Sequence, residues 1–387
     1  MKNNPDKIIH FKNLDGLRAV AAFAVVFYHI SLWIKYPDTK FYDTLKFVLA
    51  FGGRSGPLGV TFFFILSGFL ITYLMFREQA EHSKLNVPFF YIRRLLRIWP
   101  LYYLTLIAGF LIYPFFVKLS GQAYAENASP LLYSIFAVNF DNMVNGPPGT
   151  GILGVQWSVA IEEQFYLIWP LAFYLFSKKN YFPFLLLSII LLSELFFVKA
   201  SRWEVGYYHL ISNFRFLSFG GLLAYFCYFK REMVVSFLNK ISKKLHFAIY
   251  FVCLLMILFM QKLFVTFPFY RYIYHILPFL FFGFVIVEQN FSNNSFFKIG
   301  SFKLLNWLGK ISYGLYLTHM IAIYIVLSVF PESTSYPFFK ILSAVLLTVG
   351  ISHFSFTYIE LWFLSLKSKF SIIKTTGSNI FSKRQGQ

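Results

Sequence analysis

Long apolar runs recur along the whole chain, and their length is the main indication of its fold. Each of ten runs holds about 18 or more mostly apolar residues, close to the roughly 20 that an α-helix needs to cross a bilayer. Strands of membrane barrels are shorter and alternate in polarity, so these runs favour helices. The sequence therefore predicts an all-α membrane protein, a polytopic bundle of about ten transmembrane helices. The predicted spans are 14–34, 58–76, 98–117, 157–176, 181–198, 208–229, 246–264, 273–290, 307–330 and 338–362.

The two ends of the chain differ from its apolar middle. The first run follows a long polar lead, carries Arg18 and His29, and precedes no small-residue cleavage site, so we expect a retained span rather than a signal peptide. Residues 1–365 are expected to form a single transmembrane domain. Residues 366–387 are polar and basic with no clear apolar period, which predicts a mobile cytoplasmic tail.

Composition and charge fit a protein that lies in a bilayer. Hydrophobic residues make up 58% of the chain and charged residues 13%, about half the charged share of soluble domains. A net charge of +19 raises the possibility of nucleic-acid binding. Most Lys and Arg, however, fall on segments that are cytoplasmic if the N-terminus is inside, as the positive-inside rule requires. We therefore expect both termini in the cytoplasm, the lipid bilayer as surroundings and no nucleic-acid partner. The largest outer segment, 118–156, is a candidate part of an acceptor site.

The cysteines offer no framework for a disulfide or a metal. Cys227 and Cys253 both fall inside predicted spans, without zinc-ligand spacing. The sequence shows no cluster of metal ligands, no phosphate-binding glycine loop and no Ser-His-Asp order. We therefore expect neither a metal nor a bound cofactor.

Two polar residues on the first span are candidates for chemistry, because a charged group at the centre of a bilayer costs at least about 2.5–3.5 kcal/mol. His29 follows Arg18 by eleven positions, which is three helical turns plus roughly 20° and about 16 Å of rise. Both side chains should therefore lie on one helix face, with Arg18 near the cytoplasmic surface. The structural alternative is an arginine that reaches the headgroups and a histidine bonded to a carbonyl.

Acidic residues open the fourth predicted span. Glu162 lies roughly 7 Å below the outer start of that helix, at a depth similar to that of His29. It is the candidate that orients or charges the imidazole. Glu163 points about 100° away, so one site can hardly use both carboxylates equally. The alternative is a helix-end charge near water. Arg215, in the sixth span, is either a substrate contact or half of an ion pair, with Glu162 or Glu163 as candidate partners.

Further candidates lie on other spans. His319 lies in the middle of the ninth span and is either a structural hydrogen bonder or a second catalytic candidate. Arg93, Arg94 and Arg97 precede a span at the cytoplasmic interface, where they report topology or bind phosphates. Arg94 and Arg97 are three positions apart, so both can converge on one multiply charged ligand. Ser67, beside Gly68, favours close helix packing over nucleophilic chemistry.

Five elements follow one another along the chain in a specific order. They are Arg18 with ten residues before His29, the segment Gly59-Val-Thr-Phe-Phe-Phe-Ile-Leu-Ser67-Gly-Phe-Leu-Ile, Arg94-x-x-Arg97, Trp157-Ser158 with Glu162-x-x-Phe165-Tyr166, and Ile311-Ser-Tyr-Gly-Leu-Tyr-Leu-x-His319. Taken together, they resemble the integral-membrane acyltransferase type 3 family, over nearly the whole chain. One departure is that Ile359-Glu360 leads into Leu361-Trp362, where the family often has a proline shortly after the glutamate.

The resemblance implies an enzyme of the bacterial inner membrane. Such a protein moves an acyl group, acetyl being the first candidate, from cytoplasmic acyl-CoA to a hydroxyl of an envelope carbohydrate such as O-antigen, exopolysaccharide or another glycan. It also implies functional positions at Arg18, His29, Arg94, Arg97 and Glu162. Some relatives carry a fused extracytoplasmic domain, and this sequence has no long hydrophilic region for one.

The positions of these residues suggest two separate roles, donor binding and proton transfer. The basic inner surface would hold the CoA phosphates, and His29 would take the acceptor's hydroxyl proton. The rival class is a transporter or an exporter of a lipid-linked sugar, in which the same buried charges would line a conduit. The oligomeric state is left open by the sequence.

Overall fold

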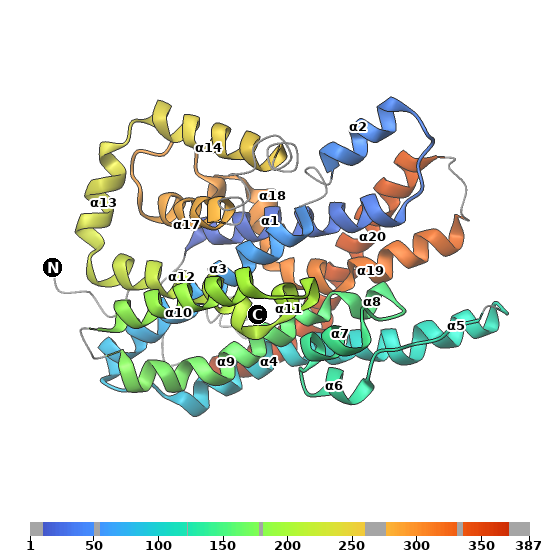
Figure 1. Ribbon diagram of the computed structural model, residues 1–387, viewed down its shortest axis with the longest axis horizontal. Coiled ribbons are helices and arrows are strands. Elements are labelled where there is room, and N and C mark those ends of the chain that lie inside the picture. Colours follow the sequence, from blue (N-terminus) through green and yellow to red (C-terminus); the bar gives the residue numbers. More distant parts are fainter. Residues whose placement is uncertain are drawn as a thin grey trace, which may run out of the picture. The chain divides into compact units, whose positions relative to one another are not determined.

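The computed structural model describes residues 11–49, 55–121, 123–177, 181–259, 276–330 and 336–370. Throughout this described part, every regular element is a helix and no strand occurs (Figure 1). The all-α prediction is therefore confirmed.

Several described helices are long and apolar enough to cross a membrane. Seven meet this description, or eight if a helix pair bent by 90° between Lys240 and Lys243 counts as one span. The multi-pass membrane class is therefore confirmed. The seven are Lys12–Trp33, Ser55–His82, Val87–Leu119, Phe182–Lys199, Trp203–Phe229, Ser312–Val329 and Pro337–Lys367.

Three further predicted spans fall on helices outside this group of seven. The run 157–176 forms α9 (Gln156–Phe176). The run 246–264 begins on α14 (Lys243–Leu258), and its last residues lie outside the described part of the chain. The run 273–290 falls largely on α17 (Ile276–Phe291), of which the structure describes 16 residues, and its first residues lie outside the described part. The count of ten spans and the cytoplasmic placement of both termini stay predictions.

The chain divides into two compact units. The first comprises 1–11, 70–218 and 353–387, and the second comprises 12–69 and 219–352. The helices α3, α12 and α20 are divided between the units. The elements, in chain order, are α1 (Lys12–Trp33), α2 (Lys40–Leu49), α3 (Ser55–His82), α4 (Val87–Ile107), the π-helical η1 (Ala108–Ile112), α5 (Tyr113–Leu119), α6 (Pro130–Ser134), α7 (Val138–Asn145), α8 (Gly151–Gly154), α9, α10 (Phe182–Lys199), α11 (Trp203–Tyr208), α12 (Leu210–Phe229), α13 (Arg231–Lys240), α14, α17, the 3₁₀ turn η2 (Ile299–Ser301), α18 (Lys303–Lys310), α19 (Ser312–Val329), α20 (Pro337–Ser355), the π-helical η3 (Phe356–Glu360), α21 (Leu361–Lys367) and the 3₁₀ turn η4 (Ser368–Phe370).

Close helix packing in the second unit positions α1. This helix packs mainly against α18 and α19 (Figure 1). The approach of α18 depends on Gly309, because a Cβ there would overlap the Asp15 carbonyl of α1. A Cβ on Gly220 of α12 would likewise overlap the backbone of α3 at Ile65. The small residue Gly68 lies on this same stretch of α3, which fits the packing role expected of the Ser67-Gly68 pair.

In the first unit, α4 and α9 form the framework that carries the charged residues. Asn86 caps α4 by accepting a hydrogen bond from the Phe89 amide, and Pro88 stands in the first turn, where its missing N–H costs nothing. Helix α4 packs against α9 and α21. The chain is helical from α21 to Phe370. Residues 371–387 lie outside the described residues, so the mobility of the tail stays a prediction.

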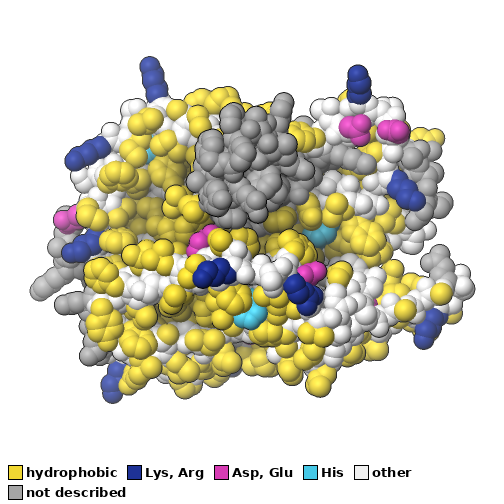
Figure 2. Space-filling view, in the orientation of Figure 1, with side chains coloured by type: hydrophobic (Ala, Val, Ile, Leu, Met, Phe, Trp, Pro, Cys, Tyr) yellow, Lys and Arg dark blue, Asp and Glu magenta, His cyan; other side chains and the backbone are white. Residues whose placement is uncertain are grey.

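Apolar side chains remain on the outer surface, as expected for helices in lipid. On α10 the exposed side chains at Phe184, Leu187, Leu191, Leu195 and Val198 recur every three or four residues, so they form one stripe. The face in Figure 2 is covered largely by hydrophobic side chains, with few charged ones. A water-soluble surface rarely has so large an apolar area.

Candidate active site

The second unit brings two histidines together. His29 lies near the end of α1, and His319 lies in the middle of α19 with no exposed surface. The Nε2 atom of His319 is 3.1 Å from Nδ1 of His29, and the ring centroids are 4.9 Å apart. Each Nδ1 also lies near the carbonyl oxygen four residues earlier in its own helix. These distances are 3.0 Å to Val25 for His29 and 3.2 Å to Leu315 for His319.

Arg18 lies in the second turn of α1. Its guanidinium forms an ion pair with Asp15 at 3.1 Å, and both side chains are partly exposed. The expected position of this arginine at the membrane surface stays a prediction. The donor-binding role of Arg18 also stays a prediction.

The first unit contains a second polar cluster, built around Arg94 of α4. The guanidinium carbon lies 5.5 Å from the ring centroids of both Phe90 and Tyr166. Arg94 interacts electrostatically with Glu163 of α9. Its Nε is buried and has no hydrogen-bond partner among the described residues. This arginine therefore keeps unused hydrogen-bonding capacity in a place where burial makes an unpaired donor costly.

The two adjacent glutamates of α9 have different neighbours. Glu163 accepts a hydrogen bond of 3.0 Å from the indole N–H of Trp99, and its other oxygen is buried without a partner in the described part of the chain. Glu162 accepts a hydrogen bond of 3.1 Å from the hydroxyl of Tyr166. Glu162 belongs to the first unit and His29 to the second. The predicted pairing of Glu162 with His29 therefore stays a prediction.

Arg97 follows Arg94 by one turn of α4 and interacts electrostatically with Glu360. Glu360 is buried and ends the π-helical segment η3, a distortion that is frequent at functional sites. Arg94 and Arg97 both lie on α4, three positions apart, and their convergence on one phosphate ligand stays a prediction. The sequence did not predict the carboxylate neighbours of these arginines, which are Glu163 for Arg94 and Glu360 for Arg97.

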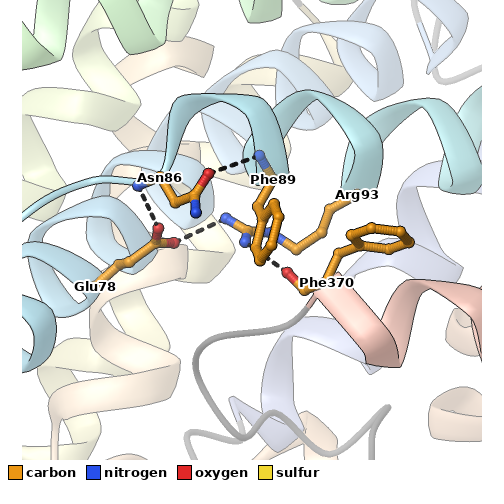
Figure 3. A network of polar contacts seen from close by, with 5 residues as sticks. All are labelled: Glu78, Asn86, Phe89, Arg93 and Phe370. Atoms are coloured by element: carbon orange, nitrogen blue, oxygen red, sulfur yellow. Dashed lines mark hydrogen bonds and ion pairs between the residues drawn. The ribbon is translucent and has the colours of Figure 1, made fainter.

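Arg93 lies in a network of its own (Figure 3). It donates to the buried carboxylate of Glu78 at 2.8 Å and to the carbonyl oxygen of Phe370 at 3.0 Å. The other carboxylate oxygen of Glu78 accepts a hydrogen bond from the backbone N–H of Asn86. The rings of Phe89 and Phe370 pack edge to face. The network thus joins the α3–α4 connection to the C-terminal η4. Donor binding by Arg93 stays a prediction.

The remaining candidates have identifiable neighbours. Arg215 forms an ion pair of 2.8 Å with Glu194 of α10 and lies 3.7 Å from the centroid of the Phe197 ring. Glu194 was missed by the sequence analysis, although a carboxylate inside the apolar run 181–198 is itself a visible signal. Trp157 packs against the rings of Tyr207 and Tyr208.

Comparison with known proteins identifies the class to which this arrangement belongs. A family model described as an acyltransferase domain matches residues 11–357, and the chain belongs to this family. The family resemblance inferred from the motifs is therefore confirmed.

Individual relatives carry more specific names. The chain is 30% identical over 375 residues to the peptidoglycan O-acetyltransferase OatA of Listeria monocytogenes, a match that covers 90% of this chain and 55% of that protein. It is 28% identical over 376 residues to the O-acetyltransferase OatA of Staphylococcus aureus, covering 91% of this chain and 57% of that protein. The chain thus spans about half the length of these relatives. No solved structure matches it.

Proposed function

We propose that this protein is a membrane O-acetyltransferase that moves an acetyl group from cytoplasmic acetyl-CoA to a hydroxyl of a cell-envelope glycan. The observation that carries the proposal is the histidine pair within membrane helices of a chain that belongs to an acyltransferase family. Peptidoglycan is the first acceptor to test, because the name of the Listeria monocytogenes relative specifies it. The inner membrane of a bacterium is the proposed location.

The donor site is assigned to the basic cluster of the first unit. CoA carries several phosphate charges, and an arginine fork binds phosphate through paired, charge-assisted hydrogen bonds. Arg94 is the best placed for this, because its buried Nε lacks a partner among the described residues. Arg97 is the second phosphate ligand. Arg18 is proposed to contact the donor arm along the face of α1 that it shares with His29.

The reaction needs one base. His29 accepts the proton of the acceptor hydroxyl through its imidazole, while the hydroxyl oxygen attacks the carbonyl carbon of the thioester. An ester C–O bond forms and the C–S bond breaks. The proton then passes from His29 to the departing CoA sulfur, which restores the neutral imidazole. Glu162 remains a candidate to stabilise this histidine.

The experiment uses the full chain, purified in detergent, with acetyl-CoA labelled in the acetyl group and peptidoglycan fragments as acceptor. Label that appears in an ester of the glycan supports the proposal. Other glycans, including lipopolysaccharide and exopolysaccharide fragments, are tested in parallel. If label reaches no acceptor in detergent, while sealed vesicles that contain the protein accumulate a lipid-linked sugar, the protein is an exporter and the proposal is wrong.

A further inference from the structure

The contact between His29 and His319 allows the protons of both rings to be assigned. A carbonyl oxygen can only accept a hydrogen bond, so a ring nitrogen facing one must carry a proton. The Nδ1 of His29 faces the Val25 carbonyl at 3.0 Å, and the Nδ1 of His319 faces the Leu315 carbonyl at 3.2 Å. Both histidines therefore carry a proton on Nδ1.

This assignment gives the contact between the rings a direction. A neutral histidine with a proton on Nδ1 has a bare Nε2, which accepts hydrogen bonds. The Nε2 of His319 is 3.1 Å from Nδ1 of His29. His319 therefore accepts from His29, and the N–H of His29 is shared between this nitrogen and the Val25 carbonyl.

The assignment also determines the state of the second ring nitrogen of His29, Nε2. With its proton fixed on Nδ1, neutral His29 presents an unprotonated Nε2. Among the residues that the structure describes, none forms a hydrogen bond with this atom. We propose that His319 is a positioning residue: together with the Val25 carbonyl it holds His29 in the tautomer whose Nε2 is the catalytic base, and it accepts the Nδ1 hydrogen bond when His29 becomes charged. The role rests on the proposed acetyl transfer.

The same geometry excludes His319 as the base itself. Its Nδ1 proton is directed at the Leu315 carbonyl, and its accepting Nε2 is directed at His29. The side chain is fully buried on α19. During transfer, Nε2 of His29 gains the acceptor's proton and later gives it to the CoA sulfur, while His319 keeps its single proton. Its Nε2 stabilises the transient imidazolium of His29 by accepting a charge-assisted hydrogen bond.

Two substitutions at 319 separate this role from simple packing. Gln places a carbonyl oxygen near the position of Nε2 and can accept from His29, whereas Leu has a similar size and accepts nothing. The Val25 carbonyl keeps the His29 proton on Nδ1, so the Gln amide is expected to turn its oxygen toward it. Both variants are purified and tested for fold by gel filtration and for donor binding with acetyl-CoA.

We expect His319→Leu to lower kcat about 10- to 150-fold, the range for a hydrogen bond to a charged group. The KM for acetyl-CoA should stay within threefold of wild type, and His319→Gln should keep kcat within about threefold. The decisive measurement repeats His319→Leu in a His29→Gln background. A positioning residue has nothing left to position there, so the second substitution should change the residual rate less than threefold.

Three results overturn this role alone, each with an active wild type. In the first, folded His319→Leu protein keeps kcat within threefold. In the second, it loses activity by the same factor with and without His29, which indicates packing. In the third, His319→Gln is folded and binds donor yet falls as far as Leu. A wild-type protein that binds acetyl-CoA but acetylates no acceptor overturns the proposed function, and this role with it.

Discussion

Arg93 and Arg94 are neighbours in sequence with different surroundings, so matched substitutions at these positions test the donor site. Arg94→Met removes the guanidinium while it keeps an apolar stem between Phe90 and Tyr166. No described residue loses a hydrogen bond to Nε, because that atom has no such partner there. If Arg94 binds a CoA phosphate, one hydrogen bond between charged groups is lost. This costs about 1.5–3 kcal/mol and weakens acetyl-CoA binding about 10- to 150-fold.

Arg93→Met is the control and should behave in the opposite way. It breaks the ion pair with buried Glu78 and the bond to the Phe370 carbonyl. An unpaired buried carboxylate costs about 3–5 kcal/mol, so the variant should unfold at lower temperature but bind acetyl-CoA normally. Binding is measured by calorimetry and unfolding by intrinsic fluorescence, both in detergent. Unchanged acetyl-CoA affinity in a folded Arg94→Met protein refutes the assignment. Weakened affinity with normal stability in Arg93→Met extends the clamp to that residue.

Three further predictions test other parts of the molecule. His29→Gln should lower turnover about 10²–10⁴-fold at normal acetyl-CoA affinity, because the amide cannot accept a proton; turnover within threefold of wild type makes His29 structural. Arg215→Met should lower the melting temperature more than the double change with Glu194→Gln, since only the single change leaves a charge unpaired; equal melting temperatures contradict a supporting ion pair. In a cysteine-free background, an impermeant thiol reagent on spheroplasts should label a cysteine introduced at Asn127 but not one at Ser378, and the reverse pattern inverts the predicted orientation.

Local features of the fold were predictable because they depend on residues close together in sequence. Apolar runs indicate helices directly, and the spacing of Arg94 and Arg97 on α4 follows from 3.6 residues per turn. The number of spans was less accessible. Hydropathy gives no sign that the chain turns by 90° between α13 and α14.

The partners of the candidate residues were the part that sequence could not supply. His29 and His319 are 290 positions apart, and nothing in one sequence links two such residues. For Arg215 the sequence left a substrate contact and an ion pair open, with Glu162 or Glu163 as candidate partners, and the structure shows an ion pair with Glu194. Long-range pairing is set by how the helices pack, which the pattern of any single helix does not contain. Glu194 itself was available as a signal, since a carboxylate in an apolar span needs a partner.

A histidine is a suitable partner for a base inside a membrane helix for energetic reasons. An ionised carboxylate in the same position would carry its charge in the resting enzyme as well, and placing that charge in a low-dielectric interior costs several kcal/mol before any pairing. A neutral His319 accepts the same hydrogen bond without a permanent charge. A positive charge then develops on His29 only when it takes the acceptor's proton. The charge disappears when His29 gives this proton to the CoA sulfur. In such a site the interaction between the two rings is stronger in the transition state than in the resting enzyme. This difference is the condition for lowering the barrier rather than tightening ground-state binding.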